Sequence, residues 1–237
     1  MTERTGDRVA RARNQFTLGP SRLDWSGGRL TIHVDETCAP VPRALKGTIT
    51  VDTRHVGEQA FPLDDGGRHH WRPVDPGAAV SVVFDRPGLS WAGRGYLDMN
   101  WGSEPLEAGF RFWDWSRFDL GDGGAAILYR TDPRQGERRE LALRFRPDGS
   151  HEAFTASDAG ELARTRYWRI RRPALAEGGG AVRLVRTFED TPFYSRSEVS
   201  ADLFGRVCRG VHESFDGDRL KLNMVRALLP VRMPRRR

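Results

Sequence analysis

Short runs of alternating apolar and polar residues, separated by glycine- and proline-rich turns, recur along this chain. The clearest run is at residues 29–34, and the Gly27-Gly28 pair just before it is a hairpin signal. Similar runs lie at residues 46–51, 79–84, 125–129, 140–145, 151–156, 165–171, 181–188 and 195–203. Many short strands at near-even spacing predict an all-β fold, in which antiparallel sheets curl into barrels or a sandwich.

Proline and glycine interrupt this pattern between residues 52 and 78, which predicts mostly loop. The sequence His69-His70-Trp71-Arg72 lies inside this loop. In an extended segment two neighbouring histidines point to opposite sides, so they do not form a metal-binding pair, and no other histidine lies at ligand spacing. The sequence therefore predicts no metal site.

The C-terminal residues show a helical pattern. Leu220, Met224 and Leu228 recur at four-residue spacing after a capping segment at residues 216–218, and Pro230 ends the run. The chain then closes with the arginines Arg232, Arg235, Arg236 and Arg237. A short apolar-faced helix before an arginine cluster is typical of proteins that rest on an anionic membrane surface. The alternative is an ordinary helix that caps the barrel, followed by a frayed basic tail.

Composition narrows the function classes. The 237 residues are enough for one large all-β domain or two small ones, and the net charge is +6 without a nucleic-acid-binding module. No apolar run is long enough to cross a bilayer, and the N-terminus has no secretory signal. No P-loop or dinucleotide motif is present, and Ser103, Ser116 and Ser195 lack a nucleophile-elbow context. Cys38 and Cys208 form no CxxC pair, which predicts free thiols in a reducing compartment.

Residues 93–117 concentrate aromatic and acidic side chains. Four of the seven tryptophans lie within this stretch or just before it, together with four acids: Trp91, Trp101, Trp113, Trp115, Asp98, Glu104, Glu107 and Asp114. An acid among aromatic rings has its ionised form disfavoured and can hold a proton near neutral pH. Such a site suits the protonation of an apolar molecule. The alternative is that the aromatics fill a barrel core, with the acids at strand ends.

Asp98 has the setting best suited to this chemistry. If residues 94–101 form a strand, Tyr96, Asp98 and Asn100 share one face and can line a cavity, while the apolar residues between them share the other. Asn100 could then hydrogen-bond the protonated carboxyl, although a satisfied structural carboxylate is the alternative. Two other acids of the stretch are predicted to form ion pairs along the chain, Asp114 with Arg117 and Glu107 with Arg111.

The motif around Asp98 resembles the carotenoid 1,2-hydratases, also called hydroxyneurosporene synthases. The likeness rests on residues 95–107 (GYLDMNWGSEPLE) and on residues 112–117 (FWDWSR). It extends to residues 19–25, 71–73, 192–196, 211–214 and 228–234, and so covers essentially the whole chain. The resemblance implies a lipocalin-like all-β fold. Because the family has a further N-terminal stretch before the position that matches Met1, the first barrel is expected to be incomplete.

The resemblance also implies a reaction, the addition of water to the terminal C-1,2 double bond of acyclic carotenoids such as neurosporene and lycopene. No organic cofactor is required. Asp98 would be the proton donor, with its pKa raised by burial, and Tyr96 and Trp71 would complete the catalytic site. The neighbouring side chains that would hold the substrate are Asn100, Trp101, Trp113 and Trp115. A lipid-borne substrate implies a cytoplasmic protein that is peripherally attached to a bacterial membrane.

We expect two parts, a partial N-terminal lipocalin-like half at residues 1–88 and a C-terminal lipocalin-like barrel at residues 89–237, which carries the short helix and the basic tail. Two other functions stay open at this point. One is a lipocalin-like isomerase or cyclase of another terpenoid or a polyketide. The other is a carrier that binds an apolar pigment without changing it. An acid inside an aromatic box favours an enzyme, since a carrier gains nothing from burying one.

Overall fold

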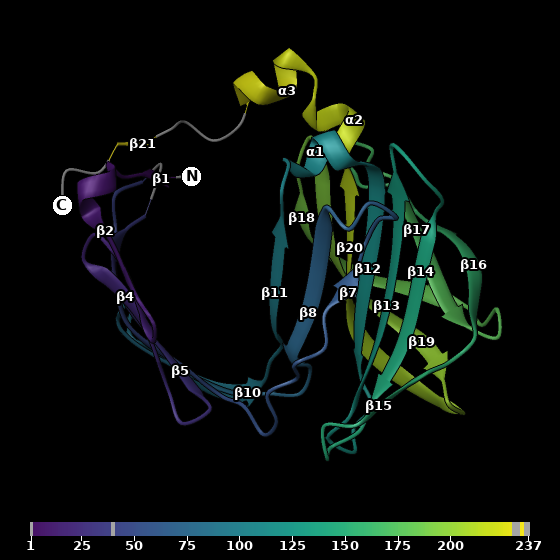
Figure 1. The fold of residues 1–237 in the computed structure, drawn as a ribbon, viewed down its shortest axis with the longest axis horizontal. Coiled ribbons are helices and arrows are strands. Elements are labelled where there is room, and N and C mark those ends of the chain that lie inside the picture. Colours follow the sequence, from purple (N-terminus) through teal and green to yellow (C-terminus); the bar gives the residue numbers. More distant parts are fainter. Residues whose placement is uncertain (1, 39–40, 229–232, 235–237) are drawn as a thin grey trace. The chain divides into compact units, whose positions relative to one another are not determined.

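The predicted all-β class is confirmed. A computed structural model describes residues 2–38, 41–228 and 233–234, and most of these residues lie in antiparallel strands (Figure 1). Contacts divide the chain into two compact units that alternate along the sequence. Unit 1 comprises Met1–Val56, Val74–Leu97 and Leu229–Arg237, and unit 2 comprises Gly57–Pro73 and Asp98–Leu228. The sequence predicted two lipocalin-like parts that meet between residues 88 and 89. That division into domains stays a prediction.

Unit 1 is built on an open sheet of seven antiparallel strands, in the order β10-β9-β6-β5-β4-β3-β2. The strands are β2 (Val9–Ala12), β3 (Gln15–Leu18), β4 (Ser21–Ser26), β5 (Arg29–Thr37), β6 (Ala44–Asp52), β9 (Ala79–Arg86) and β10 (Leu89–Arg94). A short helical turn η1 (Gly6–Arg8) precedes β2, and β1 (Thr2–Glu3) pairs in parallel with β21 (Met233–Pro234). The sheet does not close on itself within the described residues.

Alternation along these strands gives the sheet one apolar face. Leu23, Ile32, Ile49 and Val82 lie side by side on four neighbouring strands. The predicted strands at residues 29–34, 46–51 and 79–84 are therefore confirmed. The hairpin between β4 and β5 is confirmed as well, because its two glycines have φ values of 56° and 78°, a region that favours glycine.

Unit 2 contains a second open sheet of seven antiparallel strands, in the order β15-β14-β13-β12-β20-β19-β18. The strands are β12 (Phe110–Asp119), β13 (Ala125–Pro133), β14 (Arg139–Phe145), β15 (His151–Ala153), β18 (Val182–Asp190), β19 (Tyr194–Leu203) and β20 (Arg206–Asp216). The pair β16 (Ala156–Leu162) and β17 (Arg172–Glu177) forms a small sheet, and β11 (Leu97–Gly102), β8 (His69–Asp75) and β7 (Phe61–Pro62) form another. The helices are α1 (Leu106–Gly109), α2 (Gly217–Leu220) and α3 (Asn223–Leu228).

The large sheet of unit 2 has two different faces. On what we call the inner face, Phe118 and Leu128 belong to the buried core, together with Leu120, Ala126, Leu162, Leu175, Val199, Ala201, Leu203 and Cys208. On the opposite face, which we call the aromatic face, Trp113 and Trp115 lie on β12, with Tyr129 and Phe215 on the adjacent strands. The tryptophans of the central stretch therefore do not fill this core.

One segment prediction holds in part and another is wrong. Residues 52–78 are mostly loop as predicted, but residues 69–72 lie on β8 and not in the loop. Pro73 of β8 cannot donate a ladder hydrogen bond, and β7 pairs with His70 and Trp71, so Pro73 lies beyond that ladder. The strand expected at residues 165–171 is a loop. Its ends are tied together because the backbone N–H of Ile170 donates to the Thr165 hydroxyl at 2.9 Å.

The predicted C-terminal helix is broken into α2 and α3. Its predicted cap is confirmed, since the Asp216 carboxylate accepts from Arg219 N at 2.9 Å. Among the side chains of α3 that the structure describes, Val225 is buried, whereas Met224 of the predicted apolar stripe is 65% exposed. The arginine cluster, Arg232 and Arg235–Arg237, lies outside the described residues.

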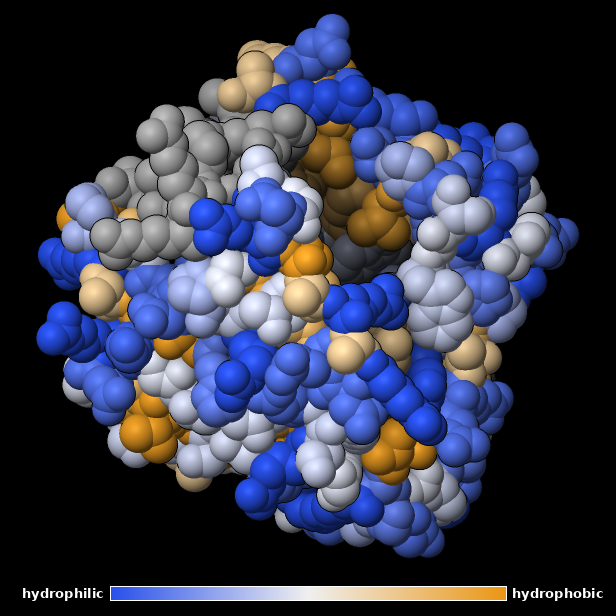
Figure 2. Space-filling model, turned by 60° about the vertical axis from the view of Figure 1, so that its left-hand side comes forward, coloured by the Kyte–Doolittle hydropathy of each residue, from blue (hydrophilic) through white to orange (hydrophobic). Residues whose placement is uncertain are grey.

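None of the helices in the described ranges is long and apolar enough to cross a bilayer. Hydrophilic side chains dominate the face shown in Figure 2, and hydrophobic ones are scattered among them. The two cysteines are free thiols as predicted, Cys38 exposed and Cys208 buried.

Candidate active site

The Asp98 carboxyl lies next to the indole of Trp71, although 27 residues separate them. Asp98 is half-buried on β11, and Trp71, which has no exposed surface, lies on the neighbouring strand β8. Trp71 Nε1 donates to Asp98 Oδ2 at 3.2 Å, and Asn100 Nδ2 donates to the same oxygen at 2.8 Å. Both of these donors therefore bind the same carboxyl oxygen, Oδ2. Strand pairing thus brings three of the predicted residues together.

Trp71 also belongs to a continuous layer of aromatic rings. This aromatic layer consists of Phe61, Trp71, Trp113, Tyr129, Tyr194 and Phe215. Tyr129 meets Trp71 edge to face, with 5.6 Å between ring centroids, and meets Trp113 at 6.0 Å. Trp113 in turn stacks on Phe215 at 5.4 Å. The Asp98 carboxyl and its two N–H donors, the Trp71 indole and the Asn100 amide, therefore lie at the border of an apolar, ring-lined region.

Sequence reasoning missed four members of this layer. Phe61, Tyr129, Tyr194 and Phe215 come from four different strands outside the central stretch. Only Tyr129 lies in a segment that the sequence predicted as a strand, at residues 125–129. Which face they share with Trp113 depends on strand register, and no local pattern reveals it.

The remaining predicted site residues lie in different surroundings. Trp115 is buried beside Trp113 on the aromatic face, opposite Tyr129 in the ladder. Trp101 is 46% exposed and stacks on His70, with 5.4 Å between centroids, so it is not part of the aromatic layer. Tyr96 is half-buried in unit 1 and precedes β11.

The strand predicted at residues 94–101 is wrong at its start, because β11 begins at Leu97. Within unit 1, Gly95 leaves no room for a side chain, because a Cβ there would overlap Val80. The N–H of Gly95 donates to Ala78 O at 2.8 Å. The shared strand face therefore holds for Asp98 and Asn100 and does not extend to Tyr96.

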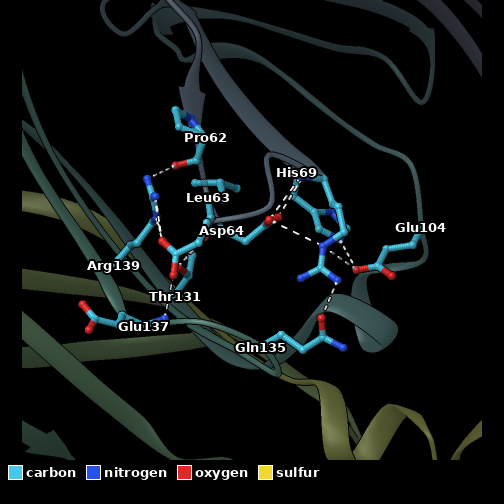
Figure 3. A network of polar contacts seen from close by, with 11 residues as sticks. Pro62, Leu63, Asp64, His69, Glu104, Thr131, Gln135, Glu137 and Arg139 are labelled. Atoms are coloured by element: carbon cyan, nitrogen blue, oxygen red, sulfur yellow. Dashed lines mark hydrogen bonds and ion pairs between the residues drawn. The ribbon is translucent and has the colours of Figure 1, made fainter.

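A polar network anchors the segment that carries Trp71 to the rest of unit 2 (Figure 3). The Asp64 carboxylate accepts from Arg68 N at 3.1 Å and from His69 N at 2.9 Å, just before β8 continues to Trp71. Burial alone would raise the pKa of Asp64, but these two N–H groups outweigh it and lower the pKa. The Thr131 hydroxyl on β13 donates to Leu63 O at 2.8 Å. The network fixes β8, and with it Trp71, against the large sheet.

The inner face of the sheet carries buried charges that do not belong to the Asp98 site. Arg130 Nε donates to Asp114 Oδ2 at 2.7 Å, and both side chains are almost completely buried. The ion pair predicted between Asp114 and Arg117 is therefore wrong, because residues three apart on a strand point to opposite faces. The predicted Glu107–Arg111 pair is wrong as well, since Glu107 pairs with Arg226 at 3.1 Å and Arg111 lies near Asp132.

A second buried group lies next to this ion pair. Ser116 Oγ is 2.8 Å from His212 Nδ1, and Ser214 Oγ is 3.1 Å from His212 Nε2. Burial, together with the charges of Arg172 and Arg130, lowers the pKa of His212 to about 3. The imidazole is neutral at physiological pH. In the described part of the chain no three His, Cys, Asp or Glu side chains gather as a metal site.

His212 makes stability depend on pH. The pKa of His212 is about 3 in the folded protein and 6.5 in the free side chain. Between these two pH values the imidazole is protonated in the unfolded chain and neutral in the folded one. The stabilisation is complete above pH 6.5 and is lost as the pH falls toward 3. We expect the free-energy difference between the wild type and His212→Asn to shrink by about 2 kcal/mol from about pH 6.5 to about pH 5. Urea unfolding at both pH values measures it, and an unchanged difference would show that His212 is not buried in its neutral form.

The comparisons with known proteins agree on one family. The family model "Carotenoid hydratase CrtC" matches residues 1–237. The chain belongs to the carotenoid hydratase family. It is 43% identical over 99% of its length to a protein of Thiocapsa roseopersicina, and 42% identical over 100% to one of Rubrivivax gelatinosus. A relative from Cereibacter sphaeroides is 37% identical over 100%. All three relatives are named acyclic carotenoid 1,2-hydratase, so the resemblance inferred from the sequence is confirmed.

This carotenoid hydratase family member spans 58% of the length of the Thiocapsa and Rubrivivax relatives and 84% of the Cereibacter relative. Among solved structures, a putative AttH protein of Nitrosomonas europaea matches with a TM-score of 0.59. The match covers 88% of this chain and 72% of that one, at 15% identity, so the likeness is one of fold alone. It agrees with the antiparallel, curled-sheet fold expected from the sequence.

Proposed function

We propose that this chain hydrates the terminal C-1,2 double bond of acyclic carotenoids and that Asp98 is the general acid. The observation that carries the proposal is the pair of hydrogen bonds from Trp71 and Asn100 to one oxygen of a half-buried carboxyl, at the border of the aromatic layer. Relatives named acyclic carotenoid 1,2-hydratase, at 37–43% identity, supply the substrate class.

The proposed reaction has two steps. In the first, the O–H bond of the protonated Asp98 carboxyl breaks, and the π electrons of the double bond form a C–H bond at the less substituted carbon. This leaves a tertiary carbocation and a carboxylate. In the second, a water oxygen bonds to the cation and its proton returns to Asp98, which restores the acid. The first step carries the barrier, and the N–H groups of Trp71 and Asn100 stabilise the carboxylate that it creates.

The aromatic side chains would stabilise the cation. We assign catalytic roles to Trp71 and Tyr96, whose rings would face the developing charge, and substrate contacts to Asn100, Trp101, Trp113 and Trp115. A cation near an aromatic face is attracted by the negative quadrupole of the ring. If two rings together supply about 3 kcal/mol, the rate rises by roughly two powers of ten.

Incubation with lycopene tests the proposal. We expect the extracted product to have gained the mass of one water. A product of unchanged mass but altered structure would favour the isomerase or cyclase alternative, and intact bound pigment would favour a carrier. Either result would overturn the proposed hydration.

The substrate also supports peripheral attachment to the cytoplasmic face of a bacterial membrane, because acyclic carotenoids dissolve in lipid rather than water. Leu222 and Met224 at the C-terminal helices are 51% and 65% exposed and could enter the headgroup region. Flotation with anionic vesicles tests this attachment. Leu222→Gln/Met224→Gln should reduce the bound fraction, whereas equal binding by the variant and the wild type would count against it.

A further inference from the structure

The orientation of Trp71 depends on what packs against its ring. An indole has two broad χ2 orientations, and turning it over moves Nε1 to the other side of the ring. Trp71 has no exposed surface, and two aromatic side chains of the layer contact it. Phe61 lies tilted at 5.5 Å, and Tyr129 lies edge-on at 5.6 Å with an interplanar angle of 84°. The hydrogen bond to Asp98 therefore requires neighbours that hold the indole in one orientation.

Of these two neighbours, Tyr129 is the more firmly held. Phe61 lies on the two-residue strand β7, whereas Tyr129 lies within β13, paired with Trp115 on one side and Leu141 on the other. Its ring is 8% exposed and also meets Trp113 edge-on at 6.0 Å. A side chain on a paired central strand is a more precise support than one on an edge or a loop.

Tyr129 is also close enough to Asp98 to respond to its charge. Burial is the main cause that raises the pKa of the Tyr129 phenol, and the next cause is the negative charge of Asp98. Both side chains also contact the Trp71 indole, Asp98 through Nε1 and Tyr129 edge-on to the ring.

We infer that Tyr129 is a positioning residue for the proposed hydration, because its ring holds Trp71 in the orientation that directs Nε1–H to Asp98 Oδ2. This inference rests on the proposed function and adds a residue outside the motif that carries the family resemblance. Tyr129 does not touch the reacting atoms in this scheme. It acts through Trp71, whose Nε1–H stabilises the Asp98 carboxylate that proton transfer creates.

The test separates the ring from the hydroxyl. Tyr129→Leu removes the ring, and we expect kcat for lycopene hydration to fall by about 10- to 100-fold with KM changed less than about threefold, since a misplacement of about 1 Å can cost that much. Tyr129→Phe keeps the ring and should stay within about threefold of the wild type. Phe154→Leu is the matched control, because Phe154 packs edge-on against Phe204 in the core of the same unit and is not a member of the aromatic layer. It should stay within about threefold of the wild type.

A double-mutant cycle shows whether Tyr129 acts through Trp71. In a Trp71→Phe background the indole N–H is absent, so Tyr129→Leu should lower kcat by less than about threefold further. Equal losses in both backgrounds, or a loss in Tyr129→Phe as large as in Tyr129→Leu, would overturn the inference.

Near-ultraviolet circular dichroism checks the fold, and Tyr129→Met replaces Tyr129→Leu if that variant does not fold. Failure of the proposed function is distinct, since the wild type itself would then add no water to lycopene.

Discussion

Asp98→Asn is expected to lower the turnover of lycopene by roughly 10²–10⁴-fold while the fold is retained. An asparagine has nearly the same shape, and its carbonyl oxygen can still accept from Trp71 Nε1, whose present hydrogen bond is 3.2 Å long. It has no acidic proton to give to the double bond. Substrate binding should therefore change little, and the loss should appear in kcat. Mass analysis of the product measures the loss of turnover, and circular dichroism checks that the fold is retained.

Asp132→Asn provides the control for this substitution. Asp132 is a half-buried residue of the same unit whose carboxylate lies 4.0 Å from Arg111, and it was not assigned to the candidate site. It should retain wild-type turnover, because an ion pair of this kind contributes little. Near-normal turnover in Asp98→Asn would remove Asp98 from the mechanism.

Arg130→Met is expected to destabilise the protein by about 3–5 kcal/mol, because it leaves the buried Asp114 carboxylate without its cation. Burial already raises the pKa of Asp114 to about 7, although Arg130 opposes this effect. Without Arg130, the Asp114 carboxyl can take up a proton, which removes the energetic cost of a buried and unpaired negative charge. The destabilisation should therefore be larger at about pH 8 than at about pH 5. Urea unfolding at the two pH values measures the difference.

An exposed ion pair gives the comparison. Arg186 pairs with Glu198 at 2.7 Å on β18 and β19, and its side chain is 67% exposed. Arg186→Met should cost less than about 1 kcal/mol at either pH, since solvent screens such pairs. If Arg130→Met cost no more than Arg186→Met, the inner-face ion pair would not be stabilising as described.

Local patterns predicted the strands well where alternation and turn residues agreed. The run at residues 29–34 became β5, and the runs at 125–129 and 140–145 became the hairpin of β13 and β14. The pattern failed at β8, where prolines suggested a loop, and at residues 165–171, where a hydrogen bond from the Ile170 N–H to the Thr165 hydroxyl closes a loop instead. In both segments the backbone conformation depends on specific contacts that the periodicity of apolar residues does not reveal.

The candidate site was predictable in part. The motif resemblance singled out Asp98 and Trp71, and the strand face correctly placed Asn100 beside Asp98. Tyr129 could not be found in this way, because it reaches Trp71 only through the register of β12 with β13 and the docking of β8. For the same reason Asp114 was assigned to a sequence neighbour, when its partner lies across the ladder on β13.

Hydration in D₂O is the most direct measurement of the central claim, that an acid of this protein protonates the carbon–carbon double bond. The account predicts that the product from lycopene carries one non-exchangeable deuterium, on the carbon next to the one that bears the new hydroxyl, and that Asp98→Asn forms almost none of this product. A hydroxylated product without deuterium at that carbon would contradict it, because the oxygen would then have arrived without protonation of the alkene.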